Sequence, residues 1–289
     1  MSKTLISVLA GLGGMFGWGI SDFFANISSD KIGHSKTVFW SQLAGMLFLG
    51  LLMFFVASNF SLTPSLVLLF VIASLCYTIG YMYFYKAFEI GNVSVVSAAI
   101  NLNVVVAMTL AFIFKGQKLI GYQPLAVFLI LFGVTLVSLN IKDLINRKVS
   151  LVAGIKEVII ASLVFGAFWN LSESLSEQTG WLPASFWVKV IALALLMFWS
   201  LFKKESIAYE KKRLNFLPTV ALVGILEAGA VASVNVGLSI GDLVLVSPIS
   251  SALSVVTISM AVIFLKEKIN KIQVIGIVIA ISGIVLSAL

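Results

Sequence analysis

Long runs of apolar residues follow one another along the whole chain, separated by short stretches that hold charges, Pro, Asn or Gly. A helix needs about 20 residues, rising about 1.5 Å each, to cross the hydrocarbon of a bilayer. The predicted crossings are residues 5–27, 37–58, 63–86, 93–114, 119–141, 151–173, 181–202, 216–240, 243–265 and 271–289. The runs lack the period-two alternation of barrel strands, so the pattern predicts an all-α membrane protein with ten transmembrane helices.

The composition agrees with lipid as the solvent. Hydrophobic residues make up 60% of the chain, charged residues 11%, and the mean hydropathy is +1.11. The net charge of +7 is spread over short loops. Such a charge is better explained by anionic lipid and insertion bias than by nucleic acid. We therefore expect a multi-pass protein of the cytoplasmic membrane, with the lipid bilayer as a partner and no nucleic acid.

The sequence offers little for catalysis or cofactor binding. It holds one histidine, His34, and one cysteine, Cys76, with no metal-ligand cluster and no Gly-rich phosphate loop after a strand. An integral membrane enzyme needs a clustered constellation of reactive groups. We therefore expect no enzyme, no metal, no cofactor and no built-in ATP motor.

Two stretches resemble each other at an offset of 150 residues. Residues 89–114 then lie on residues 239–264, and fourteen of the fifty positions from 90 to 139 are identical without a gap. The matched polar and small residues are not explained by apolar bias alone. They include Gly91 with Gly241, Ser97 with Ser247, Lys118 with Lys268, Gln123 with Gln273, and Gly133 with Gly283. The chain therefore contains an internal repeat.

Weaker matches extend the repeat to the first helices of each copy. Residues 33–40 (GHSKTVFW) resemble residues 180–187 (GWLPASFW), and Phe-Gly at 16–17 resembles Phe-Gly at 165–166. Each copy then holds five crossings. An odd number of crossings forces the second copy to run upside down, which is the architecture of many secondary transporters.

We accordingly expect two inverted five-helix repeats, residues 1–145 and residues 146–289. The most family-like pieces are FGWGISDF in the first helix, FKGQKLIGYQ (114–123) and FLKEKINKIQVIGIVIAISGIVL (264–286). With these pieces the chain resembles the drug/metabolite transporter superfamily, and within it the EamA-type transporters. The resemblance covers nearly the whole chain and implies a transporter of amino acids, sugars, nucleotide sugars or drugs, without selecting among them.

A charge interrupts the apolar segment 181–202 at Lys189. Counted from Trp181, Lys189 lies about 12 Å deep at helical rise. A charge at the centre of a helix in lipid costs about 3 kcal/mol, so it is best tolerated beside water or a counter-ion. Glu227, predicted at comparable depth in the next helix, is the expected partner. The alternatives are that Lys189 snorkels towards water, or that the two residues form a purely structural ion pair.

Polar and aromatic residues recur at spacings of three or four in several segments, which places them on single helix faces. We expect them to line a shared central cavity. The predicted cavity residues are Lys189, Glu227, Trp18, Asp22, Tyr77, Tyr81, Ser97, Asn101, Trp169, Asn170, Asn235, Ser247 and Ser251. Carboxylates in low dielectric can exchange a proton when substrate enters, so Glu227 and Asp22 are the proton-coupling candidates. Hydrogen bonding between helices and aromatic packing are the alternative roles.

Small residues form two further patterns. Gly13 and Gly17 are four apart in the first helix, and Gly229, Ser233 and Gly237 follow the same spacing in the eighth. Such faces let membrane helices approach closely, so packing is their expected role.

The leading functional expectation is a secondary transporter that moves an amino acid or a related small-molecule solute by alternating access, coupled to protons or another ion. Lys189 in the cavity would suit a carboxylate- or phosphate-bearing solute. A multidrug exporter is the first alternative, and a membrane enzyme or a scaffold protein is the alternative from another class. A homodimer and a monomer are equally compatible with the sequence.

Loop charges bear on orientation. The face with the N-terminus carries Lys3, Lys115 and Lys118, against fifteen basic residues on the other face. The positive-inside rule then places both termini outside the cytoplasm. The family resemblance implies the opposite, and both orientations stay open.

Overall fold

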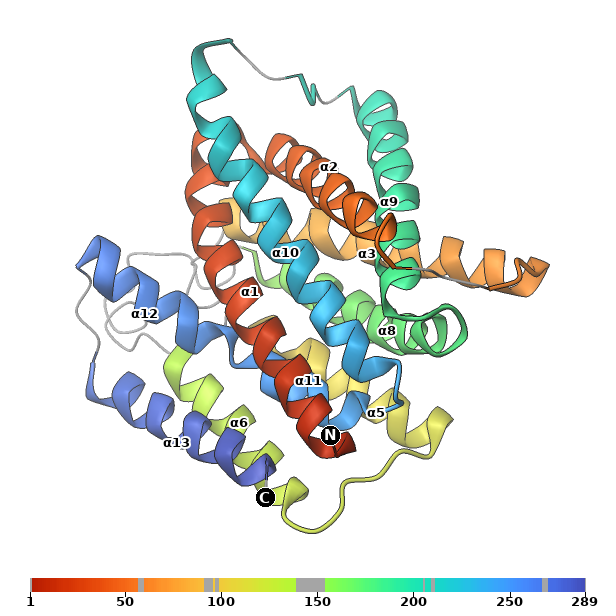
Figure 1. Cartoon of the computed structure of the whole chain (residues 1–289). Coiled ribbons are helices and arrows are strands. Elements are labelled where there is room, and N and C mark those ends of the chain that lie inside the picture. Colours follow the sequence, from red (N-terminus) through yellow and green to blue (C-terminus); the bar gives the residue numbers. More distant parts are fainter. Residues whose placement is uncertain are drawn as a thin grey trace.

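A computed structural model describes residues 2–56, 60–90, 96, 99–138, 154–204, 206–208, 211–266 and 270–288. In these residues the chain is helical throughout, without a strand (Figure 1). The helices are α1 (Lys3–Ile32), α2 (His34–Met53), α3 (Pro64–Ile90), α5 (Leu102–Lys115), α6 (Gln123–Ser138), α8 (Ile155–Thr179), α9 (Trp181–Lys203), η1 (Lys211–Phe216), α10 (Leu217–Leu238), α11 (Leu243–Ser251), α12 (Leu253–Leu265) and α13 (Lys271–Ser287).

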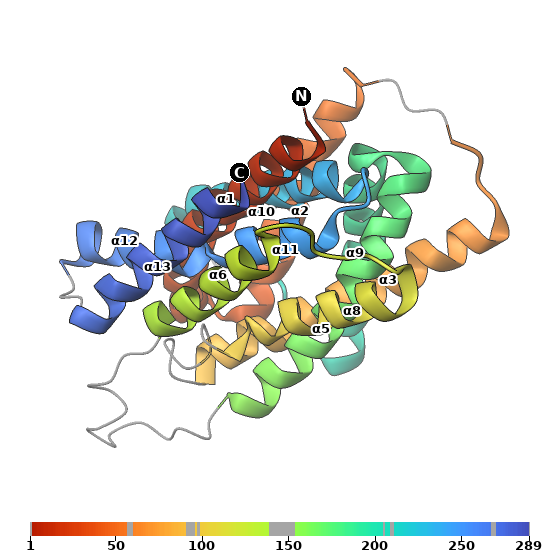
Figure 2. The same ribbon diagram turned by 90° about the horizontal axis from the view of Figure 1, so that it is seen from below.

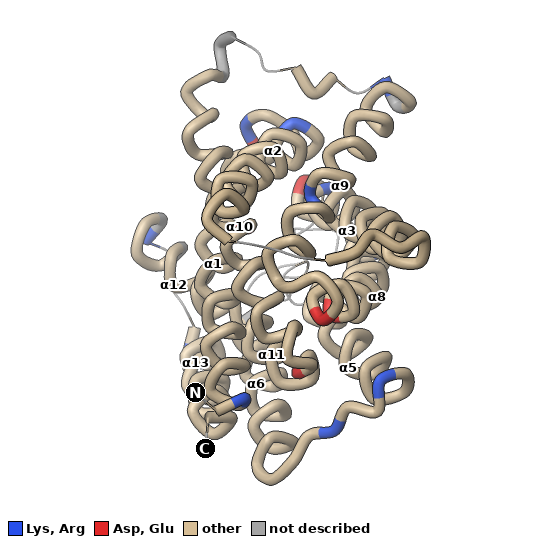
Figure 3. Tube along the Cα trace, turned by 45° about the vertical axis from the view of Figure 1, so that its right-hand side comes forward, with Lys and Arg blue, Asp and Glu red and all other residues tan. Residues whose placement is uncertain are grey.

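Length and hydropathy make this a multi-pass membrane protein. Seven helical segments are long and apolar enough to cross a bilayer, and three shorter apolar helices, α5, α6 and α13, accompany them. Charges are sparse, and the tube in Figure 3 is uncharged along most of every helix. The all-helical class is confirmed. The count of ten crossings stays a prediction, because three of the predicted ten are short.

One predicted boundary is wrong, and one predicted crossing contains a break in its helix. The sixth crossing was expected to end at residue 173, but α8 continues to Thr179, because Glu173 is fully buried and paired rather than exposed at a helix end. The ninth crossing, predicted as continuous over 243–265, is broken at Ala252. There the Ala252 N–H donates to Ile249 O at 3.1 Å, an i→i+3 bond that tightens the turn.

The main helix contacts are kept when the two copies are exchanged. The exchange takes α1 to α8, α2 to α9, α3 to α10, α5 to α12, and α6 to α13. The equivalent of α11, residues 93–101, lies largely outside the described residues. Packing of α1 on α10 then becomes packing of α8 on α3, and α2 on α10 becomes α9 on α3. The pairs α2–α9 and α6–α13 map onto themselves, and α6 lies beside α13 in Figure 2. This is the pattern that a two-fold relation between the copies requires.

The turn after the first helix of each copy has one geometry. Gly33 ends α1 with φ 89° and ψ 153°, and Gly180 ends α8 with φ 86° and ψ 160°. In each turn the glycine N–H donates to the carbonyl of a serine four residues earlier at 2.9 Å. A positive φ favours glycine, which explains why the repeat keeps it here. The matched stretches 33–40 and 180–187 are therefore structurally equivalent.

The same offset of 147 residues corrects the alignment of the first helices. A Cβ on Gly19 would lie 2.5 Å from Val256 Cβ, and a Cβ on Gly166 would lie 2.5 Å from Val106 Cβ. Because Val106 and Val256 are 150 apart, Gly166 is equivalent to Gly19. The predicted match of Phe-Gly at 16–17 with 165–166 is therefore wrong.

The small-residue faces of α1 and α10 pack against each other. A Cβ on Gly17 would lie 2.8 Å from Ala230 Cβ, and one on Gly237 would lie 3.0 Å from Ala10 Cβ. The predicted close approach is confirmed for these glycines. It is wrong for Gly229, where a Cβ would meet nothing within 4 Å in the described structure.

Candidate functional site

A buried quartet of polar side chains lies where α2, α3, α9 and α10 meet. Lys189 forms an ion pair with Glu227, and each is 1% exposed. The Lys189 ammonium also donates to Gln42 Oε1 at 2.7 Å and to the Tyr77 hydroxyl at 2.7 Å. Tyr77 in turn bonds Glu227 Oε1 at 2.6 Å. Burial of a charge in the bilayer is therefore offset by an ion pair and by hydrogen bonds to Gln42 and Tyr77.

The quartet consists of two pairs of repeat-equivalent residues. Gln42 and Lys189 are 147 apart, and Tyr77 and Glu227 are 150 apart. Members of each pair bond each other directly. Because equivalent residues contact each other directly, the quartet lies where the two copies meet.

A pocket of about 70 Å³ lies beside the quartet. Most of its lining also comes from equivalent positions in the two copies, at offsets of 147 or 150. The lining residues are Trp18, Asp22, Tyr81, Phe84, Ile100, Asn101, Asn103, Val104, Phe165, Trp169, Ser247, Ser250, Ser251 and Leu253. Trp18 is equivalent to Phe165 and Asp22 to Trp169, so neither copy alone encloses the pocket.

Two polar groups of the pocket have unused hydrogen-bonding capacity. Asp22 is 9% exposed and makes no hydrogen bond or ion pair with any residue that the structure describes. Trp18 Nε1 is buried and has no hydrogen-bond partner within the described parts of the chain. Both lie in the pocket wall, so both can serve a bound molecule.

Aromatic rings form much of the remaining wall. The Trp18 and Trp169 rings meet edge to face, with centroids 5.3 Å apart. Tyr81 contacts Phe165 in the same way at 5.1 Å. Tyr81 also links the pocket to the quartet, because its hydroxyl donates to Glu227 Oε1 at 2.9 Å. Tyr81 therefore connects the pocket directly to the ion pair of Lys189 and Glu227.

The structure brings together seven predicted cavity residues in this pocket. They are Trp18, Asp22, Tyr81, Asn101, Trp169, Ser247 and Ser251. The pocket is not lined by Tyr77, Lys189 or Glu227, because these three side chains bind one another in the quartet beside it. Ser97 lies outside the described residues.

Two predicted cavity residues are placed elsewhere. Asn170 donates to the Ala107 and Gly166 carbonyls at 3.0 and 3.1 Å, so it binds α8 to α5. Asn235 donates to Ser185 Oγ and accepts from Ser172 Oγ, both at 2.9 Å. Neither residue lines the pocket, which corrects the expectation from the sequence. Their side-chain amides form hydrogen bonds with neighbouring helices instead.

Sequence reasoning missed several lining residues. Asn103, Ser250, Phe84 and Phe165 all face the pocket. Phe165 could have been found as the equivalent of Trp18, had the offset of 147 been applied to the first helices. Ser250 is the equivalent of Ile100, which also lines the pocket, and nothing in the apolar pattern signals either residue.

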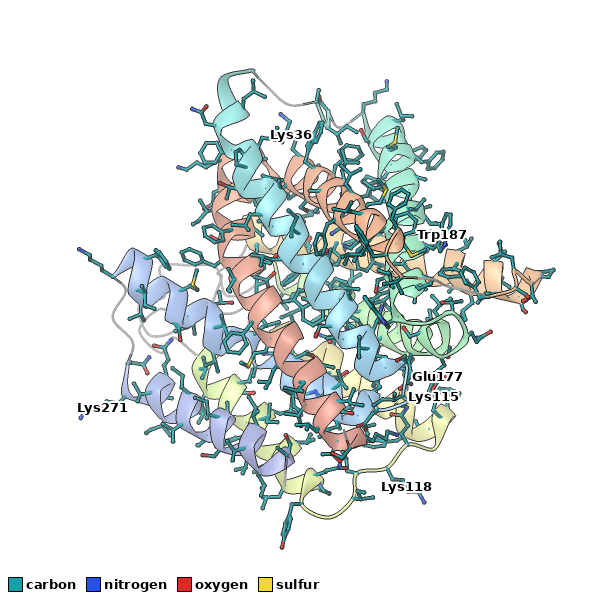
Figure 4. All side chains as sticks on the ribbon, in the orientation of Figure 1. Lys36, Lys115, Lys118, Glu177, Trp187 and Lys271 are labelled. Atoms are coloured by element: carbon teal, nitrogen blue, oxygen red, sulfur yellow. The ribbon has the colours of Figure 1, made fainter. Side chains whose placement is uncertain are left out.

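A second polar network lies at the face that holds the N-terminus. Glu173 is fully buried and pairs with Lys115 at 2.6 Å. Glu173 Oε1 also accepts from Gln117 Nε2 at 2.7 Å and from the Leu243 N–H at 3.1 Å. These bonds join the end of α5, in the first copy, to α8 and the start of α11, in the second. Figure 4 shows Lys115 with Glu177 at this end of the molecule.

Asp242 lies in the same region, at the loop before α11. Its carboxylate accepts a hydrogen bond from the Ser7 hydroxyl, and Lys3 donates to the neighbouring Gly241 carbonyl at 3.3 Å. Burial raises the pKa of Asp242 above its ordinary value, while the bond from Ser7 and the charge of Lys3 oppose that rise.

Comparison with known proteins decides the family. The model of the EamA-like transporter family matches residues 5–139 and 152–289. The chain belongs to the EamA-like transporter family. EamA-like proteins are transporters rather than enzymes, so this chain is a membrane transporter of small solutes.

The fold is also found among solved structures. One, described only as "Crystal structure of protein", aligns with a TM-score of 0.76 and 13% identity, over 97% of this EamA chain and 95% of the other. At that identity the likeness shows the fold alone. No curated protein matches the chain.

Proposed function

We propose that this EamA-like protein is a secondary active transporter of the cytoplasmic membrane. It moves a small organic metabolite, an amino acid or a related solute, by alternating access between two inverted repeats. The solute binds in the pocket between the repeats. The observation that carries the proposal is that the pocket wall is built from equivalent residues of both copies, as expected for a site that both faces reach in turn.

The breaks in the pocket-lining helices support this reading. α11 ends and α12 begins at the pocket wall, near Ser251 and Leu253. In the first copy, α5 begins beside Asn101, where Asn103 N donates to Ile100 O at 2.9 Å in another i→i+3 turn. Discontinuous helices at mid-depth are a recurring feature of transporter substrate sites.

Of the two proton-coupling candidates, the contacts favour Asp22. Glu227 is held by Lys189, Tyr77 and Tyr81, so a proton added to it would break a closed network. Asp22 lines the pocket without a partner in the described chain. It can therefore exchange its proton for a solute without disturbing other bonds, which is what coupling requires.

A cysteine block tests the proposal without a disruptive mutation. The variant Ser251→Cys is made with Cys76→Ala, purified and reconstituted in liposomes. Counterflow of a labelled amino-acid mixture is measured before and after a small thiol reagent. We expect modification at position 251 to stop flux, because the added group fills the pocket.

The matched control is Ser282→Cys in the same background, since Ser282 is exposed on α13 and outside the pocket. Its modification should leave flux unchanged. Equal inhibition at both positions, or flux that survives full modification at 251, would refute transport through this pocket.

A further inference from the structure

We propose that the transported solute carries a cationic group, a protonated amine or another organic ammonium, which binds at Asp22 among the aromatic rings of the pocket. This inference rests on the proposed transport function and names the class of its solute. It reverses the expectation from the sequence, in which Lys189 favoured an anionic solute.

The charges around the pocket carry the first step. Asp22 is the only charged residue in the described pocket wall. Behind it, Lys189 and Glu227 neutralise each other, although the charge of Glu227 still acts on Asp22. When Asp22 is ionised, the three groups together leave one negative charge in excess. A buried excess charge is costly, so the site favours a ligand that brings one positive charge.

The donors of Lys189 carry the second step. An ammonium has three N–H donors. Those of Lys189 are matched by three acceptors, Gln42 Oε1, the Tyr77 hydroxyl and Glu227 Oε2. No donor is left for a carboxylate or phosphate of a solute. An anion in the pocket would instead face the Asp22 carboxylate.

The aromatic wall carries the third step. Five of the fourteen lining residues are aromatic: Trp18, Tyr81, Phe84, Phe165 and Trp169. Ring faces attract cations, and the attraction strengthens when the cation leaves water. A carboxylate among aromatic rings is thus a recognition site for ammonium groups. The free Trp18 Nε1 adds one donor, so the solute also benefits from a neutral acceptor such as a carbonyl or hydroxyl oxygen.

Three probes of nearly equal shape separate the charge classes: phenethylammonium, phenylacetate and 2-phenylethanol. Binding to the purified full chain in detergent is followed by thermal shift and by tryptophan fluorescence, because Trp18 and Trp169 line the pocket. A ligand that binds the folded state raises the unfolding temperature. We expect phenethylammonium to bind about tenfold or more tightly than either other probe.

The variant Asp22→Asn should reduce phenethylammonium affinity to that of 2-phenylethanol while leaving the neutral probe unchanged. Asp242→Asn is the matched control, since Asp242 does not line the pocket, and it should bind all three probes like the parent. Should Asp22→Asn fold poorly, tetramethylammonium gives a second measurement. Its competition with phenethylammonium on the parent protein tests the ring cage without any mutation.

Preferential binding of phenylacetate, unchanged phenethylammonium affinity in Asp22→Asn, or absence of competition by tetramethylammonium would overturn the cation assignment. The transport proposal fails separately, through the cysteine block at position 251. Flux of an anionic solute that is blocked at 251 would keep transport and reject the cationic class.

Discussion

The two copies of the repeat place different chemistry at equivalent positions. In the first copy, the Tyr77 hydroxyl lies 2.8 Å from Gln42 Oε1, and both side chains are neutral. In the second copy, the equivalent residues are Glu227 and Lys189, which form an ion pair. The helix arrangement is thus similar in the two copies, while the charges at their contact are not. Two identical copies would make exchange between the two faces energetically neutral. Under the proposed alternating access, the charged pair is therefore a candidate for what makes the two states differ in energy.

A second difference separates the two faces. The face with the N-terminus is joined across the copies by the buried Glu173, paired with Lys115 at 2.6 Å. On the opposite face, the described pair across the copies is Lys86 with Glu157 at 3.4 Å, and the Lys86 side chain is 47% exposed. Buried pairs are harder to break than exposed ones. We therefore expect the state described here to be held closed mainly at the N-terminal face.

The largest predicted effect comes from removing one of the two charges of the buried ion pair in the second copy. Glu227→Leu or Lys189→Met alone leaves an unpaired buried charge, which costs about 3–5 kcal/mol of folding stability. The double variant removes both charges and should be nearly as stable as the parent, since apolar replacement of a buried pair is often neutral. Denaturant titration of the purified protein in detergent measures all three.

The double variant separates stability from function. If the ion pair distinguishes the two transport states, the double variant should fold normally but lose the asymmetry of flux between the two directions in liposomes. A double variant as unstable as the sum of both singles would contradict the compensation argument. Unchanged directional asymmetry would show that the difference between the copies lies elsewhere.

The next prediction tests whether two positions, one in each copy, are structurally equivalent. Gly19→Ala and Gly166→Ala each place a Cβ 2.5 Å from a valine Cβ on the neighbouring helix. Overpacking of this kind costs about 1–3 kcal/mol, and the two variants should lose similar stability. Gly229→Ala is the control and should cost little, because its Cβ would meet nothing within 4 Å in the described chain. A large gap between the first two would refute the offset of 147 residues.

Part of this architecture was predictable because periodicity and depth are properties of the chain alone. The pairing of Lys189 with Glu227 follows from helical rise and adjacent antiparallel helices. The matched Gln123 and Gln273 proved to have a shared local role. Gln123 Oε1 accepts from Ile120 N at 3.0 Å, and Gln273 Oε1 accepts from Asn270 N at 3.0 Å, so both cap the start of a last helix. Local bonds of this kind require the same residue in both copies, so they can be recognised from the internal repeat.

The rest of the site depends on which helix faces pack against each other. The pattern of residues along one helix does not show which neighbouring helix each side chain will meet. Asn101, Asn170 and Asn235 are alike as sequence, yet one lines the pocket and two bind neighbouring helices. The isolation of Asp22 and the saturation of Lys189 also arise only in the packed structure. The sequence alone therefore favoured an anionic solute, whereas the contacts of Asp22 and Lys189 lead us to propose a cationic one.

A smaller effect compares two hydroxyls that serve the same carboxylate. The Tyr77 hydroxyl accepts from Lys189 and has Glu227 and Gln42 as acceptors for its one proton, whereas Tyr81 bonds Glu227 alone. Tyr77→Phe leaves buried groups without a partner and should cost about 1–3 kcal/mol. Tyr81→Phe should cost about 1 kcal/mol or less, because Glu227 keeps Lys189 and Tyr77. Equal losses in denaturant titration would contradict the central position of Tyr77.

The smallest effect concerns Asp242 at the face that holds the N-terminus. Burial raises its pKa in the folded protein, so between the unfolded and folded values the folded state binds more protons than the unfolded one. Stability from this group is then full below the unfolded pKa of about 3.9 and is lost as pH rises through the folded value. Asp242→Asn removes this dependence and, by keeping an acceptor for Ser7, should change stability by only about 0.5 kcal/mol. Unfolding temperatures of parent and variant at several pH values, with the exposed Asp30→Asn as control, should diverge in favour of the variant as pH rises. If the parent instead gained stability over the variant with rising pH, the carboxylate would be stabilised in its charged form, and Lys3 rather than burial would govern this end of the molecule.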